Sequence, residues 1–397
     1  MPLQAGRNLS PLRYDKGDQT HLSLAPAETS FQRLIRFSVK SAGLEPASGK
    51  PALVEPQPSR IVILTRFCCR HFFCSESRYA DTSTDPLSED NLHYRFKLLE
   101  LFCLPSLLGQ SSQEFDWVIL VDKDLPAIHL ERLKQLVARR TRTYIQTHPA
   151  KQELCSLDWL REHIPPQTEW LVTVHLDDDD MLPADYLEKL RTLVRSRANQ
   201  TAPTLYTVFG VSKVLFWDLH FSPIAKLGYI APYHRSARYA SCGFGFLARY
   251  PAVNYNVLGL SHVAPNWFQS GTTAPQAKFD RFLEEVERLE SQGLLERSDL
   301  GRADYSASLD TDRPVVMTNH RRNVQWCRVL EYKPRTRMTR SSDLRPYSLD
   351  VDKILEHKDY FRVCLERQAR FYRWKPHQLI ANLVTSPLVV LRTLLRR

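Results

Sequence analysis

Four consecutive aspartates, Asp177–Asp180, follow the apolar run Trp170–Leu176. The run is short and rich in β-branched residues, so it predicts a buried strand. In open α/β folds, ligands bind at the edge of the sheet where the strands end. Carboxylates crowded at such an edge repel one another unless a cation neutralises them. The sequence therefore predicts that a metal ion, and the chemistry of this chain, are found here.

The spacing of these acids permits two metal-binding pairs. Side chains on alternate residues of an extended segment point the same way, and oxygen ligands suit hard cations such as Mg²⁺ and Mn²⁺. Asp177 and Asp179 have this spacing, and so do Asp178 and Asp180. An acidic loop that caps the helix expected at Asp185–Arg197 would explain the same run without a ligand.

A second acid pair, Asp122 and Asp124, ends the strand expected within Phe115–Pro126. An apolar strand followed by such a pair resembles the nucleophile motif of aspartate-based phosphatases, in which the first aspartate attacks phosphorus. An aspartate-dependent phosphohydrolase that uses Asp122 is therefore one alternative. Against it, Leu125 and Pro126 follow where such enzymes place a small residue and a threonine, and no suitably placed lysine motif is evident.

The composition is that of a globular protein with a basic bias. Of 397 residues, 43% are hydrophobic and 25% are charged, so the middle of the chain can bury a substantial core. The formal net charge of +10 favours anionic partners, and a non-enzymatic nucleic-acid-binding protein is a second alternative. Four clustered acids at a strand end, and the lack of a motif with spaced base-reading residues, argue against nucleic acid as a partner.

The cysteines and the apolar runs indicate the cellular compartment of the protein. Cys68, Cys69 and Cys74 cluster around His71, as zinc ligands can, but no second paired set follows, so buried thiols are the preferred interpretation. This favours a reduced, cytoplasmic protein. The N-terminus lacks a basic-then-apolar signal pattern, and no apolar run reaches the length of about 18 residues expected of a membrane span.

The alternation of strands and helices predicts an α/β fold with a mainly parallel sheet and helices on both faces. Strands are expected at Arg60–Phe67, within Phe115–Pro126, at Thr143–Ile145 and at Trp170–Leu176, with helices at Leu92–Leu108, Leu130–Arg140 and Asp185–Arg197 and a helical turn at Asp158–His163. Farther on, we expect antiparallel additions at Leu205–Phe209 and Lys213–Trp217, turns at Cys242–Tyr250, a helix at Lys278–Ser291 and a strand at Pro314–Thr318.

Three segments in order carry a family resemblance: RIVILTRF, LPSLLGQSSQEFDWVILVDKD and HLDDDDMLPADYLEKL. Together they resemble the nucleotide-sugar glycosyltransferases of the GT-A fold and, within them, the rhamnosyltransferase family. The resemblance covers roughly residues 60–190. It implies a GT-A-like mixed sheet in a single Rossmann-like domain with C-terminal additions. We therefore expect the glycosyltransferase domain at 60–345 and a helical segment at 346–397. Pro, Ser, Gln and Gly punctuate residues 1–59, which predicts a disordered extension there.

The resemblance also implies roles for individual residues. Thr65 and Arg66 end the first strand, which in the family lies against the nucleotide, and Asp122 would contact the base or ribose. The family's proline falls four residues after the second acid of its DxD motif, as Pro183 follows Asp179 here. This favours Asp177 and Asp179 as the pair that binds Mn²⁺ or Mg²⁺. Asp178 and Asp180 are left to hold a ribose hydroxyl or to orient a neighbouring group.

The residues expected to act on the acceptor lie later in the chain. An inverting enzyme of this type requires a base that deprotonates the acceptor hydroxyl. Asp280 is the first candidate, with Glu284 near it, and His262 is the second; a retaining enzyme would need none of them. A late histidine supplies a further metal ligand in several GT-A families, and His320 has that place here. Aromatic residues that could stack on sugar rings are Tyr229, Tyr233, Trp267 and Phe268.

The C-terminal sequence HQLIANLVTSPLVVLRTLLRR combines an apolar stripe with terminal arginines. This pattern suits an interfacial helix on anionic lipid, at the inner face of a membrane, although Pro387 interrupts it and docking on the protein's own core is the alternative. The leading hypothesis is a metal-dependent glycosyltransferase that moves a sugar, such as rhamnose, from a nucleotide-diphosphate donor to a glycan or lipid-linked acceptor.

Overall fold

The computed structural model describes residues 59–70, 85–149, 154, 156–199, 206–211, 213–219, 221, 225–232, 242–258, 291, 304–319 and 337–361. The chain divides into two units, Met1–Gly49 and Lys50–Arg397, and every described residue belongs to the second. The extension expected at 1–59 lies outside the described residues apart from Ser59. The domain boundaries expected at 60 and 345 remain predictions.

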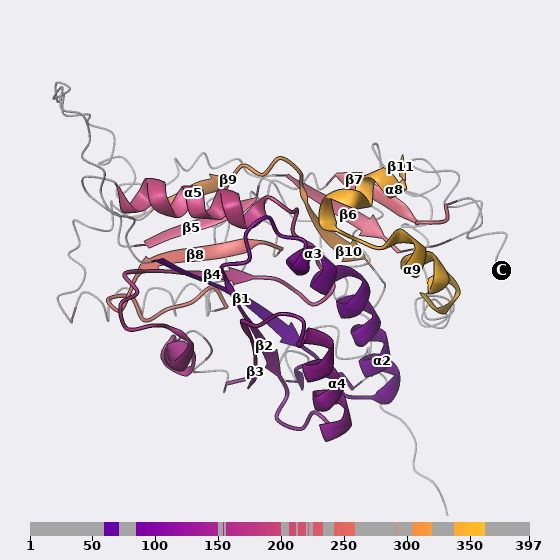
Figure 1. Ribbon diagram of the computed structural model, residues 1–397, viewed down its shortest axis with the longest axis horizontal. Helices are drawn as coiled ribbons and strands as arrows, with labels where there is room; N and C mark the ends of the chain where they lie inside the picture. The colour runs from indigo at the N-terminus through magenta and orange to yellow at the C-terminus, as the bar shows by residue number, and fades with distance from the viewer. Residues whose placement is uncertain are drawn as a thin grey trace, which may run out of the picture. The chain divides into compact units, whose positions relative to one another are not determined.

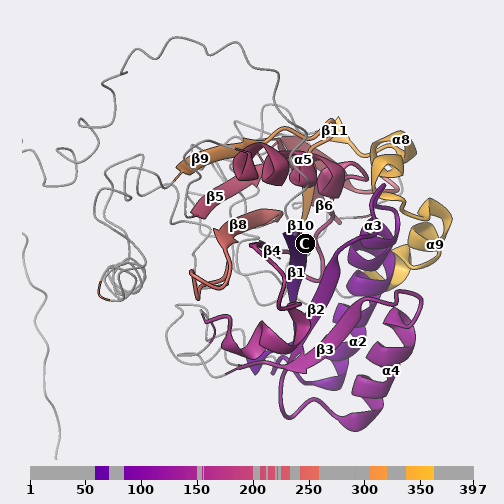
Figure 2. The same cartoon turned by 60° about the vertical axis from the view of Figure 1, so that its left-hand side comes forward.

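The larger of two sheets has seven strands in the order β3-β2-β1-β4-β8-β5-β9 (Figures 1 and 2). These strands are β1 (Ser59–Phe67), β2 (Asp116–Val121), β3 (Thr143–Thr147), β4 (Trp170–His175), β5 (Tyr206–Val211), β8 (Phe244–Arg249) and β9 (Asp304–Leu309). β1 pairs in parallel with both β2 and β4, β2 with β3, and β5 with β9, whereas β8 is antiparallel to β4 and β5. The predicted mixed, mainly parallel sheet is confirmed.

The described α-helices that cover this sheet contribute to the core of one face only. They are α2 (Glu89–Leu98), α3 (Leu104–Leu108), α4 (Ala127–Val137) and α5 (Tyr186–Ala198), and each contributes buried side chains to one cluster with Ile61, Ile63, Val172 and Val174. The opposite face packs against the 3-10 helix Asp158–His163 and residues 253–257. In the described part of the chain, α-helices cover one face and a 3-10 helix packs on the other, so the sheet is flanked by helices as predicted, while α-helices on both faces remain a prediction.

A second sheet, which the sequence did not predict, has four strands in the order β10-β6-β7-β11. They are β6 (Val214–Asp218), β7 (Tyr229–Pro232), β10 (Val315–Asn319) and β11 (Arg337–Met338), followed by α8 (Ser341–Leu344), a 3-10 turn (Arg345–Tyr347) and α9 (Val351–Glu356). β6 pairs in parallel with β10, so the stretch Lys213–Trp217 is not an addition to the larger sheet. This sheet has its own core, in which Trp217, Ile230 and Val316 are buried.

The long helix that begins with α2 lies between the cores of the two sheets. Phe96 and Leu99 contribute to the core of the larger sheet, while Tyr94 and Phe102 contribute to that of the smaller. A π-helical turn, Leu99–Cys103, joins α2 to α3, and Pro105 follows it. Proline lacks the N–H that an α-helix would require at that position, which accounts for an irregularity one turn earlier. The predicted helix at Leu92–Leu108 is confirmed, with this irregularity near its proline.

β8 corrects another expectation, because Cys242–Tyr250 was predicted to be rich in turns. Phe244–Arg249 is instead a strand that pairs with β4 and β5 in the middle of the sheet. Its glycines suggested turns, but Gly245 serves close packing: a Cβ there would lie 2.1 Å from the ring of Phe209. Gly243, the other glycine of this stretch, has a φ of +69°, the left-handed conformation that favours glycine.

At the edge of the sheet where the parallel strands begin, Asp116 is fully buried between two arginines. Arg60 donates to its Oδ1 over 2.8 Å, and Arg142 donates to both of its oxygens over 3.0 and 3.1 Å. Two guanidinium groups offset the cost of burying this carboxylate. Asp116 is therefore a charged group that holds the fold together at the edge opposite to the ends of β1, β2 and β4.

The described beginning of the C-terminal segment packs on the protein's own core. Phe361 is fully buried, and its ring contacts those of Tyr94, Phe102 and Phe221 at centroid distances of 5.8 to 5.9 Å. The sequence expected to lie on a membrane, from His377 onward, lies outside the described residues. In the part of the chain that the structure describes, no helix has the length and apolar character needed to cross a bilayer.

Candidate functional site

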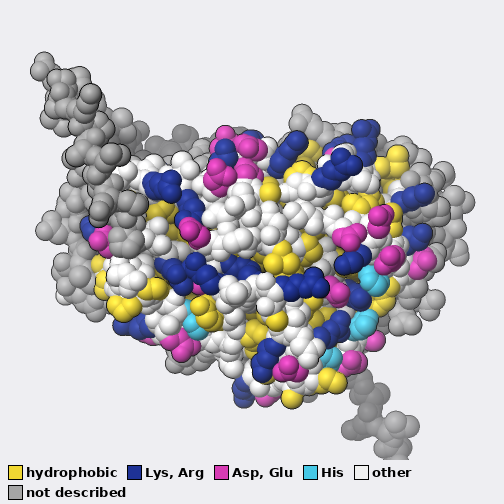
Figure 3. All heavy atoms as spheres, viewed as in Figure 1, with side chains coloured by type: hydrophobic (Ala, Val, Ile, Leu, Met, Phe, Trp, Pro, Cys, Tyr) yellow, Lys and Arg dark blue, Asp and Glu magenta, His cyan; other side chains and the backbone are white. Residues whose placement is uncertain are grey.

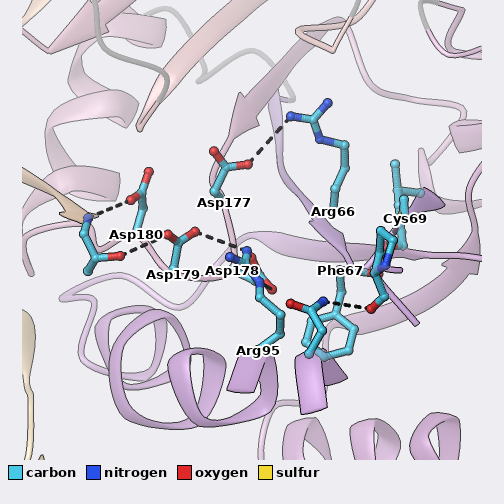
Figure 4. Close-up of polar contacts among 12 residues, drawn as sticks. Arg66, Phe67, Cys69, Arg95, Asp177, Asp178, Asp179 and Asp180 are labelled. Atoms are coloured by element: carbon cyan, nitrogen blue, oxygen red, sulfur yellow. Dashed lines mark hydrogen bonds and ion pairs between the residues drawn. The ribbon is translucent and has the colours of Figure 1, made fainter. Parts of the chain in front are cut away.

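The carboxyl ends of β1, β2 and β4 meet at one edge of the sheet and bring together the loops that the sequence singled out. Arg70, after β1, donates its backbone N–H to Asp122, after β2, over 2.8 Å. Arg66, near the end of β1, lies 3.7 Å from a carboxylate oxygen of Asp177, after β4. Parallel pairing explains this convergence, because parallel strands end on the same side of a sheet. Figure 4 shows the side chains at this edge.

The four aspartates form a turn rather than a continuation of the strand. β4 ends at His175, and the N–H of Asp180 donates to the carbonyl of Asp177 over 3.1 Å. Met181 then exchanges two backbone hydrogen bonds with Val316 of β10, so the turn is anchored to the second sheet. The expectation that alternate acids point the same way along an extended segment is therefore wrong, and each carboxylate has its own surroundings.

Asp177 is the most exposed of the four acids, with 32% of its side chain accessible. Its Oδ1 lies 3.0 Å from Nε2 of His175 and 3.7 Å from the guanidinium of Arg66, which itself lies 3.2 Å from the same histidine nitrogen. Burial raises the pKa of Asp177, but His175, Arg66 and Arg95 outweigh it and hold that pKa well below its usual range. Asp177 is an ionised carboxylate that a ligand can reach.

Asp178 is fully buried and forms an ion pair with Arg95 of α2, a residue that the sequence analysis did not single out. Nε of Arg95 donates to Oδ2 of Asp178 over 2.9 Å, and its Nη2 contacts Oδ1. The same Nη2 lies 3.3 Å from Oδ1 of Asp179. The expected contact of Asp178 with a ribose hydroxyl is revised, because both oxygens of its carboxylate face this guanidinium. The sequence feature that could have revealed the role of Arg95 is its position between two large aromatic residues, Tyr94 and Phe96, both of which are buried.

Asp179 and Asp180 are held from the opposite side by Thr318 of β10. The hydroxyl of Thr318 donates to Oδ2 of Asp179 over 3.0 Å, and its backbone N–H donates to Oδ1 of Asp180 over 3.1 Å. Burial, together with the negative charges of Asp179 and Asp177, raises the pKa of Asp180 well above its usual range. Asp180 therefore takes up a proton more readily than a free aspartate.

Asp122 is buried and its carboxylate is hydrogen-bonded to the backbone of two loops. It is 3% exposed, and its two oxygens accept the backbone N–H groups of Arg70 and Asp124 over 2.8 and 3.0 Å. A carboxylate held in this way joins the loop after β1 to the turn after β2. Its burial and its two backbone partners disfavour the phosphohydrolase alternative, in which Asp122 would attack phosphorus.

Thr65 also has a partner in the core. Its side chain is fully buried, and its hydroxyl accepts the indole N–H of Trp117 over 2.9 Å. Of the two residues expected to meet the donor at the end of β1, only Arg66, with 21% of its side chain accessible, faces the acids.

Ser106 and Gln110, in the second segment of the resemblance, hold the chain that follows the aspartates. Oγ of Ser106 accepts the N–H of Leu182 over 3.4 Å. The side-chain amide of Gln110 donates to the carbonyl of Pro183 over 2.9 Å and accepts the N–H of Leu187 over 3.2 Å. Two of the three resembling segments are therefore in direct contact, through groups that set where α5 begins.

Cys68 and Cys69 are free and buried, as the sequence predicted for these thiols. Burial raises the pKa of each to about 12. We expect alkylation of both thiols at pH 8 to be about a thousandfold slower in the folded protein than in urea, since the thiolate is the reactive form. Peptide mapping after iodoacetamide treatment measures this. Fast labelling of the folded protein, at a rate close to that in urea, would contradict it.

Several expected site residues lie outside the described residues, namely Asp280, Glu284, His262, His320, Tyr233, Trp267, Phe268, Cys74 and His71. Tyr229 is described, and it is a half-buried residue of β7 that pairs with Asp218 and Met338. Within the described part of the chain, no three His, Cys, Asp or Glu side chains are arranged to hold a metal ion.

The charges around the turn nevertheless suit a divalent cation. Among the described residues, four carboxylates lie at this turn and two guanidinium groups, those of Arg66 and Arg95, contact three of them, so these six groups sum to a charge of −2 when all four acids are ionised. Burial is the main cause of the raised pKa of Asp180, and the negative charges of Asp179 and Asp177 add to it. Carboxylate oxygens are the ligands that Mg²⁺ and Mn²⁺ prefer. The donor set therefore fits such an ion, with Asp177 as the accessible member.

Residues 60–207 match the model of a protein family described as "Putative rhamnosyl transferase". The match contains all three segments of the resemblance stated from the sequence, and it confirms that resemblance. It supports glycosyltransferase activity, while the sugar rests on the family's description alone. No curated protein matches the sequence.

Solved structures of low identity are also similar to the chain. TarS from S. aureus has 11% identity and a TM-score of 0.25, over 38% of this chain and 35% of TarS, so the chain spans about a third of that structure; a second TarS structure contains UDP-GlcNAc. The mannosyltransferase PcManGT from Pyrobaculum calidifontis, in complex with GDP-Man and Mn²⁺, has 11% identity and a TM-score of 0.28, over 92% of this chain and 85% of that one. The mixed, mainly parallel sheet is established by the strand order of this chain and not by these similarities.

Proposed function

Since the match over residues 60–207 supports glycosyl transfer, we propose that this chain is a metal-dependent glycosyltransferase that uses a nucleotide-diphosphate sugar. The observation that carries the proposal is the turn Asp177–Asp180, whose acids outnumber the guanidinium groups that the structure describes beside them, at the edge where three parallel strands end. In open α/β sheets this edge is where ligands bind. Rhamnose as the sugar, and a glycan or lipid-linked glycan as the acceptor, belong to the same proposal.

In this proposal Asp177 and Asp179 hold Mn²⁺ or Mg²⁺, with His320 as a further ligand. Thr318 donates to Asp179, and two residues later in the chain His320 can lie at most about 7 Å from it, measured between Cα atoms. A divalent cation at this position would offset the charge of the pyrophosphate as it leaves. No metal geometry is implied beyond the identity of these ligands.

The chain's own groups complete the donor site. The guanidinium of Arg66 is accessible beside Asp177 and can pair with a phosphate oxygen, which it would contact through two N–H groups. His175 lies against both side chains, so it fixes the orientation of Asp177 relative to Arg66. Asp280, or else His262, is proposed to deprotonate the acceptor hydroxyl if the reaction inverts configuration.

The basic composition gives less support to a nucleic-acid partner. On the face drawn in Figure 3, a row of lysine and arginine side chains runs across the middle, with acidic side chains above and below it. A basic stripe suits a nucleic-acid backbone, but four aspartates lie at the edge where the parallel strands end, which is where this kind of sheet binds ligands. The excess positive charge is therefore attributed to general attraction for anionic substrates, of which a nucleotide sugar is one.

The proposal is tested by a thermal-shift panel of UDP-, dTDP- and GDP-sugars, each with Mn²⁺, with Mg²⁺ and with EDTA. We expect one nucleotide to raise the melting temperature only when a divalent cation is present, because the cation links the acids to the pyrophosphate. The free sugar serves as a control that lacks the pyrophosphate. Shifts that are the same in EDTA and in Mn²⁺, for every nucleotide, would reject the metal-dependent site.

A further inference from the structure

Arg95 contacts two members of the aspartate turn, Asp178 and Asp179, and its side chain is only 19% exposed. It belongs to α2, which is held between the cores of the two sheets, so its backbone position is determined by packing on both sides. In Figure 4 it lies below the turn, on the side away from Arg66. Arg95 and Arg66 therefore approach the four acids from different directions.

The contacts of Arg95 divide the four acids into distinct groups. Asp178 turns inward, where a two-pronged contact with Arg95 offsets the cost of its burial. Asp179 has one oxygen near Arg95, at 3.3 Å, and the other on Thr318. Asp177 keeps an accessible carboxylate beside Arg66. Once Asp178 is committed to Arg95, the alternative metal pair of Asp178 and Asp180 is unavailable.

We propose that Arg95 is a positioning residue that selects the metal-binding pair: by binding Asp178 in the core, it leaves Asp177 and Asp179 to hold the cation. This inference rests on the proposed metal-dependent function. It assigns Asp178 no ligand role, and its contribution to the site is to neutralise Arg95 beside Asp179. The pair of Asp178 and Arg95 is then replaceable by an uncharged pair without loss of the metal.

The test is a double-mutant cycle read by Mn²⁺ affinity, measured from the electron paramagnetic resonance signal of the free ion without any donor. Asp178→Asn leaves the charge of Arg95 uncompensated next to Asp179, so we expect Mn²⁺ binding to weaken by about tenfold or more. Arg95→Met added to Asp178→Asn removes that charge, and we expect affinity to return to within about threefold of wild type. This recovery is the signature of the proposal, because further damage to a structural pair would not restore affinity.

Asp116→Asn is the matched control, since it also neutralises a buried aspartate held by arginines, at the other edge of the sheet. We expect it to leave Mn²⁺ affinity unchanged. The inference is overturned if Asp178→Asn has no effect on Mn²⁺ binding, if Arg95→Met does not restore what Asp178→Asn loses, or if Asp116→Asn weakens binding equally. Failure of the wild-type protein to bind Mn²⁺ would instead reject the proposed function, so the two failures are distinguishable.

Discussion

Asp177→Asn is expected to weaken Mn²⁺-dependent binding of a nucleoside diphosphate by about a hundredfold or more, because it removes the accessible carboxylate of the proposed metal pair. Asparagine keeps the size of the side chain and its oxygen, so the effect reports on charge. Isothermal titration of the nucleoside diphosphate in the presence of Mn²⁺ measures the change.

The same variant should remain folded. The pKa of Asp177 lies below its usual range in the folded protein, so its ionised form stabilises the fold at pH above about 4, and this contribution is lost as the pH falls through the folded pKa. At neutral pH the asparagine variant loses that contribution, which is modest for a side chain that is one-third exposed. Asp158→Asn, at an exposed acid on the opposite face of the sheet, is the control and should bind normally. Unchanged nucleotide binding by Asp177→Asn would reject Asp177 as a ligand.

Arg95→Met is expected to lower the free energy of unfolding by about 3–5 kcal/mol at neutral pH, because it leaves Asp178 buried without its cation. Methionine is similar in length and apolar, so the loss reports mainly on the unpaired charge. Urea unfolding measures it. The penalty should shrink as the pH approaches about 4, where an aspartate takes up a proton and its burial costs less.

Arg142→Met provides the comparison for that loss. Asp116, its partner, is equally buried but keeps Arg60 when Arg142 is removed, so the expected destabilisation is smaller. Equal losses in the two variants, or a loss below about 1 kcal/mol for Arg95→Met, would show that Asp178 does not depend on Arg95 for its burial.

The alternation of strands and helices was enough to predict where the site lies. Parallel strands end at one edge, so Arg66, Asp122 and Asp177 could be brought together from the order of elements alone. The conformation of the acids themselves could not be predicted in this way. Nothing local distinguishes a strand that continues through Asp177–Asp180 from one that stops at His175, and the turn depends on pairing with β10, far along the chain.

Arg95 shows a different limit of the sequence. Its neighbours Tyr94 and Phe96 are both buried, but in the cores of different sheets, and the second sheet was not predicted. If only the larger sheet is expected, one face of the helix is expected to meet solvent, and an arginine on that face needs no partner. The strands of the second sheet are short, and β11 has only two residues. Alternation of apolar and polar residues cannot be recognised in strands of this length.

The π-helical turn at Leu99–Cys103 makes the length of this helix as important as its composition. Before this turn, Arg95 donates a hydrogen bond to Asp178. After it, Ser106 and Gln110 form hydrogen bonds with the backbone of Leu182 and Pro183, which follow the aspartates. An α-helix rotates by about 100° for each residue, and a π-turn absorbs one residue of that rotation. Deleting a single residue from Leu99–Cys103 would rotate Ser106 and Gln110 about the helix axis relative to Arg95, so that both sets of hydrogen bonds could not form together. This stretch should therefore accept changes of side chain far more readily than changes of length.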